Sequence, residues 1–327
     1  MISRRAKVVL ARRFSFSPMR VIAMRHFLDI SSVSRDELVS LLFEAQKLKA
    51  AHLRGEANSL LSRKLVGLIF EKPSLRTRVS FEAAVIHLGG RSLFLPAQEV
   101  GLGWRESVPD FARTMNHYVD ALVLRVFKHS TLIAMTDCSE VPIINGLSDI
   151  AHPCQTTADL LTMQELFGDL KGRTVVFVGD GNNVARSLAL GCGTLGIRFR
   201  LAAPKGYGFD DAFRTAFRKH SPKGSLESVI DPIKAVRDAD IIYGDVWTSM
   251  GQEDEREKRL RDFAHYQINA KLLAAAPKHA RVMHCLPAHR GEEITDEVVD
   301  GDRSVVFQQA GNRLHAQKAI LAWLLTK

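Results

Sequence analysis

Four short polar clusters in the sequence combine residue types that suit the binding of an anion or a small polar substrate. In the first, the apolar run Leu65–Phe70 leads through residues 71–78 (Glu-Lys-Pro-Ser-Leu-Arg-Thr-Arg) into a helical pattern. Ser74, Arg76 and Thr77 therefore stand at a helix N-terminus, where free N–H groups, the helix dipole, two hydroxyls and a guanidinium converge. This arrangement predicts a cradle for phosphate or carboxylate, although an ordinary serine N-cap followed by surface arginines would have the same residues.

The other three clusters also stand where a predicted element begins or ends. His152-Pro-Cys-Gln155 starts a helical pattern in which proline suits the first turn. Asp245-Val-Trp-Thr-Ser-Met-Gly251 and His284-Cys-Leu-Pro287 each follow an apolar strand pattern, and open α/β sheets bind ligands at the carboxyl ends of their strands. Taken singly, each cluster has a plainer interpretation: a structural histidine, a buried cysteine or a fragment of a metal site.

Strand and helix patterns alternate along the chain and would position these clusters. A capping box, Ser-Arg-Asp-Glu, predicts a helix after Ser34, with apolar residues at helical spacing and Gly55 closing it. Strands that are apolar throughout indicate parallel sheets buried under helices. The predicted strands are Leu65–Phe70, Ser92–Leu95, Ala121–Val126, Thr174–Val178, Phe199–Ala203, Asp240–Gly244 and Val282–Cys285.

Two α/β domains are predicted, each a mainly parallel sheet flanked by helices. The segment Gly168-Asp-Leu-Lys-Gly172 interrupts the pattern, a new strand begins after it, and a long helix over residues 153–167 precedes it. An amphipathic last helix, which carries Trp323, is expected to return to the first domain. The predicted divisions are a leader at 1–23, a first domain at 24–152, a second domain at 153–310 and the returning helix at 311–327.

Length and composition exclude several classes of protein. The chain has 327 residues, of which 46% are hydrophobic and 25% charged, as is typical of a globular protein with an ample core. No uncharged apolar run approaches the roughly 18–20 residues of a membrane helix, so a soluble protein without a membrane partner is predicted. The four cysteines form no CxxC pair, which argues against a disulfide framework or a structural zinc site and favours a reducing compartment.

The formal charge of +9 is concentrated in the leader. Residues 1–23 hold six basic residues and no acidic one, which leaves 39 basic against 36 acidic residues in the rest of the chain. A chain-wide basic surface for nucleic acid is therefore not expected. The leader is predicted to be disordered and the protein cytoplasmic. An acid-free leader rich in Arg and Ser would also suit a transit peptide for an organelle matrix.

Taken together, the four clusters resemble the aspartate/ornithine carbamoyltransferase family, and its ornithine branch in particular. Both branches share the motifs Ser-x-Arg-Thr-Arg and His-Pro-x-Gln. The ornithine branch is distinguished by Asp-x-x-x-Ser-Met-Gly and His-Cys-Leu-Pro. The resemblance covers residues 24–327. It implies transfer of a carbamoyl group from carbamoyl phosphate to the δ-amine of L-ornithine, a step of arginine biosynthesis that yields L-citrulline and phosphate. It implies no cofactor and no metal.

The resemblance also implies a role for each cluster. The first domain would bind carbamoyl phosphate, and the second would bind ornithine. The residues implied at carbamoyl phosphate are Ser74, Leu75 (through its backbone N–H), Arg76, Thr77, Arg125, His152, Gln155, Cys285, Leu286 and Arg313. The residues implied at ornithine are Asn183, Asp245, Ser249 and Met250. The side chains implied in catalysis are Arg125, His152, Asp245 and Cys285.

Two further structural features follow from the resemblance. The Leu286–Pro287 peptide bond would be cis, because the chain must turn there to aim the Leu286 carbonyl into the site. Residues 101–107 resemble a loop that leans into a neighbouring subunit's site, which implies a homotrimer with three shared sites.

The sequence departs from the family pattern at two positions. Leu75 stands where threonine is usual, and Trp104 stands where we expect a small or basic residue. Both departures leave room for an alternative acceptor, N-acylated ornithine. The intact cluster from Asp245 to Gly251 argues against that acceptor, because Asp245 would pair with a free α-amino group.

Two alternatives of other classes fit parts of the sequence. Val178-Gly-Asp-Gly-Asn-Asn183 resembles half of a dinucleotide fingerprint and would indicate an NAD-dependent dehydrogenase, but its third glycine is missing. The other alternative is a catalytically inactive regulatory paralogue. The presence of every charged and polar site residue argues against it.

Overall fold

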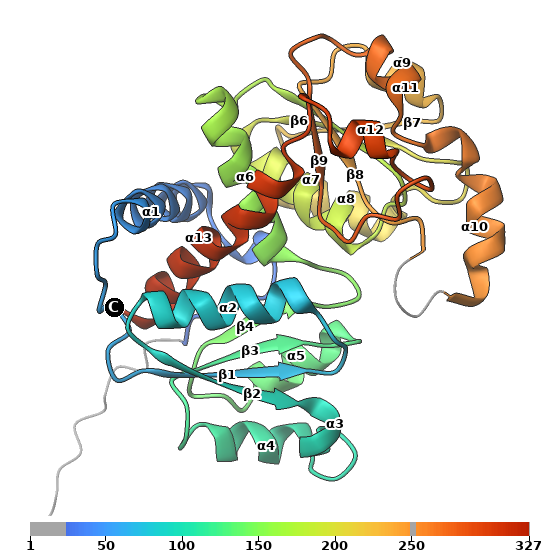
Figure 1. Cartoon of the computed structure of the whole chain (residues 1–327). Coiled ribbons are helices and arrows are strands. Elements are labelled where there is room, and N and C mark those ends of the chain that lie inside the picture. The colour runs from blue at the N-terminus through green and yellow to red at the C-terminus, as the bar shows by residue number, and fades with distance from the viewer. Residues whose placement is uncertain (1–23, 249–252, 327) are drawn as a thin grey trace, which may run out of the picture.

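Two parallel β-sheets carry the clusters that the sequence singles out (Figure 1). The computed structural model describes residues 24–248 and 253–326. Helices pack against the sheets, and the C-terminal helix reaches from the second sheet to the helices of the first. The predicted fold class, α/β with two mainly parallel sheets flanked by helices, is confirmed. Among the described residues, no helix combines the length and apolar character needed to cross a membrane.

The first sheet has four strands in the order β2–β1–β3–β4. The strands are β1 (Leu65–Phe70), β2 (Arg91–Pro96), β3 (Ala121–Arg125) and β4 (Ile143–Leu147). The helices of this part are α1 (Arg35–Leu53), α2 (Leu75–His87), α3 (Ala97–Val100), α4 (Val108–Met115) and α5 (His129–Thr136), with a 3-10 helix at Ile30–Ser32. The predicted capping box before α1 is present, since Ser34 and Glu37 each accept a hydrogen bond from the other's backbone N–H.

The second sheet has five strands in the order β7–β6–β5–β8–β9. The strands are β5 (Thr174–Val178), β6 (Arg198–Ala202), β7 (Ser225–Val229), β8 (Ile241–Gly244) and β9 (Arg281–His284). The remaining α-helices are α6 (Pro153–Phe167), α7 (Asn183–Leu195), α8 (Asp211–His220), α9 (Pro232–Ala235), α10 (Arg256–Asp262), α11 (Ala270–Ala275), α12 (Asp296–Val299) and α13 (Val306–Leu325). Short 3-10 helices lie at Glu253–Glu255 and Ala264–Tyr266.

The seven predicted strands are confirmed to within one residue at either end, but the sequence pattern misses β4 and β7. β4 has the buried Asn145 at its centre, which interrupts the apolar run and donates a hydrogen bond to the Leu28 carbonyl at 2.8 Å. β7 is an edge strand with the sequence Ser-Leu-Glu-Ser-Val. An edge strand that is only partly buried lacks the continuous apolar signature of an inner parallel strand.

α6 and α13 join the two sheets through a shared hydrophobic core. α6 is buried from Pro153 to Met163, and it packs against α13, α7 and α1. One cluster of buried side chains runs from Val66 of the first sheet to Val175 and Phe177 of the second. The long helix that the sequence predicts over residues 153–167 is therefore a central element of the structure.

α13 returns to the first sheet's helices, as predicted, but it is not amphipathic over its middle. It packs against α1, α2 and α6, so apolar and polar side chains alike are enclosed there. A helix that lies between two layers has little solvent face, which removes the reason for an amphipathic pattern. Its buried polar side chains are Gln309, Asn312, Arg313, His315, Gln317 and Lys318.

The strand orders place the polar clusters opposite one another. The order reverses between β1 and β3 in the first sheet and between β5 and β8 in the second. Connections leave such a pair of strands in opposite directions, which opens a crevice at their carboxyl ends. β1 leads to Ser74 and β3 ends at Arg125, while β5 leads to Asn183 and β8 leads to Asp245. Each sheet therefore presents its candidate residues at its own crevice.

Candidate active site

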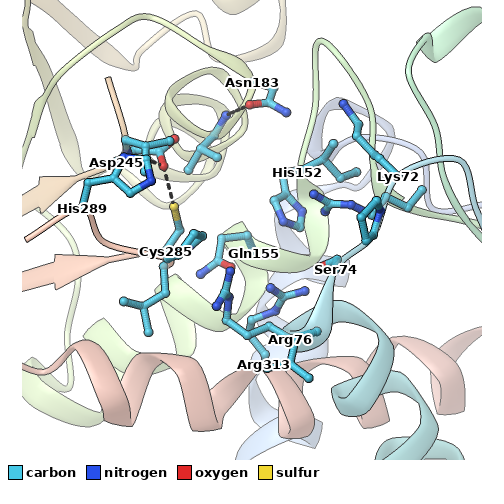
Figure 2. A pocket seen from close by; sticks show the side chains of 18 of the residues that line it. Lys72, Ser74, Arg76, His152, Gln155, Asn183, Asp245, Cys285, His289 and Arg313 are labelled. Carbon is cyan, nitrogen blue, oxygen red and sulfur yellow. Dashed lines mark hydrogen bonds between the residues drawn. The ribbon is translucent and has the colours of Figure 1, made fainter. Parts of the chain in front are cut away.

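A cavity of about 370 Å³ lies between these two crevices (Figure 2). Its lining residues are Lys72, Pro73, Ser74, Leu75, Arg76, Arg125, Leu147, His152, Gln155, Asn183, Val184, Asp245, Val246, Thr248, Cys285, Leu286, Pro287, His289 and Arg313. Every described residue that the sequence predicts for the site is in this set except Thr77. Ser249 and Met250, also predicted, lie outside the described residues.

The start of α2 forms one wall of the cavity. The Ser74 hydroxyl caps the helix by accepting from the Thr77 N–H at 3.3 Å, and it donates to Thr77 Oγ1 at 3.0 Å. Ser74 is therefore an ordinary N-cap and a cavity residue at once. Thr77 is fully buried, and its Oγ1 also accepts from the Arg313 guanidinium at 2.8 Å. The Leu75 side chain stands at the edge of the cavity with 75% of its surface exposed.

Three guanidiniums, those of Arg76, Arg125 and Arg313, surround the end of the cavity near α2 (Figure 2 labels the first and last). Burial, with the charges of Arg313 and Arg76, lowers the pKa of Arg125 to about 10. Burial also lowers the pKa values of Arg76 and Arg313. Within the described chain, Nε of Arg125 and Nε of Arg313 are buried without a hydrogen-bond partner. A group of three like charges, of which Arg125 and Arg313 are buried and have free donors, is a site that favours an anion.

His152 and Gln155 lie beside these arginines at the start of α6. The backbone N–H of His152 donates to the Ser187 hydroxyl at 2.8 Å, which holds the turn before the helix. Burial, followed by the three arginine charges, lowers the pKa of His152 well below its usual value, so the imidazole is neutral. The amide NH₂ of Gln155 donates to Asp159, while its oxygen is buried without a partner in the described structure. The pair thus offers a neutral imidazole and a free acceptor oxygen.

The opposite end of the cavity has one carboxylate among its described lining residues, that of Asp245. Its Oδ2 accepts from the Asn182 amide at 2.7 Å, and its Oδ1 accepts from the Cys285 thiol at 2.9 Å. Burial first, and the neighbouring Asp245 second, raise the pKa of Cys285 well above its usual value, so this side chain is a thiol that donates. Asn183 also lines the cavity, and its amide donates to the Ser148 carbonyl at 2.7 Å.

The turn after β9 contributes Cys285, Leu286 and Pro287 to the lining of the cavity. The Leu286–Pro287 peptide bond is cis, as predicted. Leu286 has a φ of 56°, in the left-handed region, and its N–H donates to Nδ1 of His284 at 3.0 Å.

Sequence reasoning misses four polar residues of the site. Lys72, Thr248 and His289 line the cavity, and Asn182 holds the Asp245 carboxylate. Lys72 is within the first polar cluster, and His289 follows the last cluster by two residues, so proximity in sequence was the available signal. Asn182 is the N-cap of α7, and its side chain accepts from two backbone N–H groups of that helix. A capping residue that also binds across to another strand has no local signature.

Comparison with known proteins places residues 25–165 and 171–324 of this chain in one family. The carbamoyl-P binding domain of aspartate/ornithine carbamoyltransferase matches residues 25–165, and the Asp/Orn binding domain matches residues 171–324. An ornithine carbamoyltransferase of Archaeoglobus fulgidus is 48% identical over 305 residues, covering 93% of this chain and 98% of that protein. The corresponding enzyme of Bacillus subtilis is 47% identical, covering 93% and 94%.

Solved structures agree with the sequence comparisons. The ornithine carbamoyltransferase of Pyrococcus furiosus superposes with a TM-score of 0.90 at 46% identity, over 93% of this chain and 97% of that chain. An acetylornithine transcarbamylase complexed with acetylcitrulline superposes with a TM-score of 0.84 at 30% identity, over 93% and 100%. The motifs, the two sheets and these matches agree: this chain belongs to the aspartate/ornithine carbamoyltransferase family.

Proposed function

We propose that this protein is an ornithine carbamoyltransferase, which transfers the carbamoyl group of carbamoyl phosphate to the δ-amine of L-ornithine. The observation that carries the proposal is the polarity of the cavity. Arg76, Arg125 and Arg313 crowd one end, and the Asp245 carboxylate lies at the other. An anionic donor and an acceptor with a cationic α-amino group match these two ends.

The phosphate of the donor belongs at the α2 end. Ser74, Arg76 and Thr77 and the backbone N–H of Leu75 would hold it, because the first turn of α2 offers N–H groups without helical partners. Arg313 reaches the same turn through its hydrogen bond to Thr77. Loss of the family's threonine hydroxyl at Leu75 leaves that backbone N–H in place.

The carbamoyl group belongs between Arg125, His152 and Gln155. Arg125 and the neutral His152 would donate to its carbonyl oxygen, where negative charge develops during attack. The free oxygen of Gln155 would accept from its NH₂ group. Fixed donors in a buried site need no reorganisation as the charge develops, so they stabilise the transition state more than the substrate.

The acceptor belongs at the Asp245 end. Asn183 would bind the ornithine carboxylate, and Asp245, with Ser249 and the backbone of Met250, would bind the α-amino group. Cys285 and the Leu286 carbonyl would face the δ-amine, whose pKa resembles that of lysine. The δ-ammonium must first release a proton. Its nitrogen lone pair then bonds to the carbonyl carbon, and the bond from that carbon to the phosphate oxygen breaks with its electron pair remaining on phosphate. The same nitrogen passes a second proton to the released phosphate, which leaves neutral citrulline.

A substrate comparison tests the proposed reaction. The expected product is citrulline from L-ornithine, with L-aspartate and N-acetyl-L-ornithine each disfavoured by ~10⁴-fold or more in kcat/KM, because a site built to pair a polar group rejects a substrate that leaves it unpaired. Turnover of N-acetyl-L-ornithine at comparable efficiency would assign the acceptor to the N-acylated class instead. Absence of a carbamoylated product with all three acceptors would overturn the proposal.

The proposal also covers the substrate that each segment binds, the oligomeric state and the cellular location. Residues 24–152 would bind carbamoyl phosphate, residues 153–310 would bind ornithine, and residues 311–327 would pack back on the first part. The loop 101–107 would complete a neighbour's site in a homotrimer, in agreement with the 76% exposure of Trp104 at its tip. All four cysteines are free thiols, which fits the cytoplasm.

A further inference from the structure

A carboxylate that does not line the cavity stands directly behind it. Asp159 lies in α6 one turn after Gln155 and is fully buried. Its Oδ1 accepts from the amide NH₂ of Gln155 at 2.8 Å and from that of Gln309 at 2.7 Å. Its Oδ2 accepts from the Tyr243 hydroxyl at 3.0 Å. Donors from three elements therefore converge on one buried acceptor, and burying a carboxylate is costly enough to call for a role.

These contacts decide which way the Gln155 amide faces. An amide has a donating NH₂ at one end and an accepting oxygen at the other. Because the NH₂ of Gln155 is bound to Asp159, its oxygen is directed away from Asp159, and that oxygen is buried without a partner in the described structure. Without an acceptor at Asp159, the amide could turn over and present its NH₂ group to the cavity instead.

We propose that Asp159 is a positioning residue, which holds the Gln155 amide so that its oxygen, and not its NH₂, meets the carbamoyl NH₂ of the donor substrate. The inference rests on the proposed function, in which Gln155 touches that group. The carbamoyl nitrogen can only donate, so a turned amide would place two donors against each other. Asp159 thus acts on the substrate through Gln155.

The same carboxylate also orients a second amide. The NH₂ of Gln309 donates to Asp159 and, at 3.0 Å, to the Tyr243 hydroxyl. Its oxygen is thereby left to accept from the His284 N–H at 2.8 Å, one residue before Cys285. Asp159 therefore orients the Gln155 amide near the arginines and the Gln309 amide next to the turn that carries Cys285. A test must separate the effect through Gln155 from a general loss of structure.

A double-mutant cycle makes that separation. Asp159→Leu, which removes the acceptor and keeps the branched shape of the side chain, should lower kcat/KM for carbamoyl phosphate by about 10- to 100-fold in the wild-type background, because a displaced contact at the reacting group is costly. In the Gln155→Ala background the same change should cost less than about threefold, because the amide it positions is gone. Tyr243→Phe is the matched control: it removes the donor to Oδ2 and one of the two acceptors of the Gln309 NH₂, but it leaves the contact between Asp159 and Gln155. It should cost less than about threefold in either background.

The inhibition constant of inorganic phosphate separates a positioning role from a structural one, because general damage to the site would change it. Inorganic phosphate shares the phosphate site but has no carbamoyl NH₂, so its inhibition constant should be the same in wild type and Asp159→Leu. Equal losses for phosphate and carbamoyl phosphate, or an equal cost of Asp159→Leu in the two backgrounds, would overturn the inference.

Should Asp159→Leu fail to fold, Asp159→Ser replaces it in the same cycle, because the shorter side chain cannot reach the Gln155 amide and still keeps a polar atom in place. The outcomes also separate this inference from the proposed function. A wild-type enzyme that makes no citrulline defeats the proposed function, whereas an active enzyme with an additive cycle defeats only the role of Asp159.

Discussion

The Cys285 thiol donates a hydrogen bond to the Asp245 carboxylate, with 2.9 Å between Sγ and Oδ1. This contact joins the ends of β9 and β8, which are 40 residues apart in sequence. The Asn182 amide and the Val246 N–H also donate to the same carboxylate. Three hydrogen-bond donors thus hold the Asp245 carboxylate at the end of the cavity that we assign to ornithine.

Asp245→Asn should raise KM for ornithine by about 30-fold or more, because a buried charge partner worth about 2–5 kcal/mol is lost. Cys285→Ala should cost less in KM for ornithine, since Asn182 and the Val246 N–H still hold the carboxylate. Steady-state kinetics with each substrate varied in turn provide the check. If Asp245→Asn leaves KM for ornithine unchanged and raises KM for carbamoyl phosphate, the carboxylate acts on carbamoyl phosphate and not on ornithine.

Arg76→Ala or Arg125→Ala should remove about 3–5 kcal/mol of transition-state stabilisation, measured from kcat/KM, because each change takes away a charge-assisted donor to the developing charge. Arg113→Ala is the matched control, since Arg113 is exposed on α4 and pairs only with Asp110 among the described contacts. The control should retain nearly full activity. Near-normal activity of either active-site variant would refute its role.

Subunit mixing tests the proposed homotrimer. A variant at Arg105, in the loop 101–107, and a variant at Arg76 should each be inactive alone, because each lacks one part of every shared site. When the two are dissociated and reassembled together, partial activity should return, since some hybrid sites draw both parts from intact copies. An active monomer in solution, or verified hybrids without activity, would show that each chain builds its own site.

The pH dependence of stability should carry the signature of Asp159. Burial raises the pKa of this carboxyl from 3.8 to about 7, although three hydrogen-bond donors and Arg313 act in the opposite direction. Between pH 4 and 7 the folded state therefore holds a proton that the unfolded state has released, so stability falls as the pH rises through this window. The free energy of unfolding that is lost between pH 4 and 7 through this group is about 4 kcal/mol.

Asp159→Asn has no such titration and provides the comparison. Its free energy of unfolding, measured by denaturant titration, should increase relative to that of wild type between pH 4 and 7 and then stay level. The other ionisable groups that act on this carboxyl from neighbouring elements, Arg313 and Tyr243 among them, are the same in both proteins. A difference that does not vary with pH would show that Asp159 is already ionised at pH 4.

The sequence by itself determined most of the secondary structure and the chemistry of the clusters. The inner strands are apolar throughout because both of their faces are buried, and that property is local enough to be read from a few residues. The Ser34 capping box and the helix that begins at Pro153 are likewise set by short-range interactions. β4 and β7 were not predicted, because Asn145 interrupts the apolar pattern of β4 and the sheet edge leaves β7 only partly buried.

Only the tertiary structure decided how the clusters meet. The reversal of strand order in each sheet brings Arg125 and Asp245 to the two ends of one cavity, and no periodicity in the chain encodes that reversal. The contact between Asp159 and Gln309 spans 150 residues, and Asn182 binds Asp245 from a different element. A buried polar residue needs a hydrogen-bond partner, but its own sequence neighbourhood does not say where along the chain that partner lies.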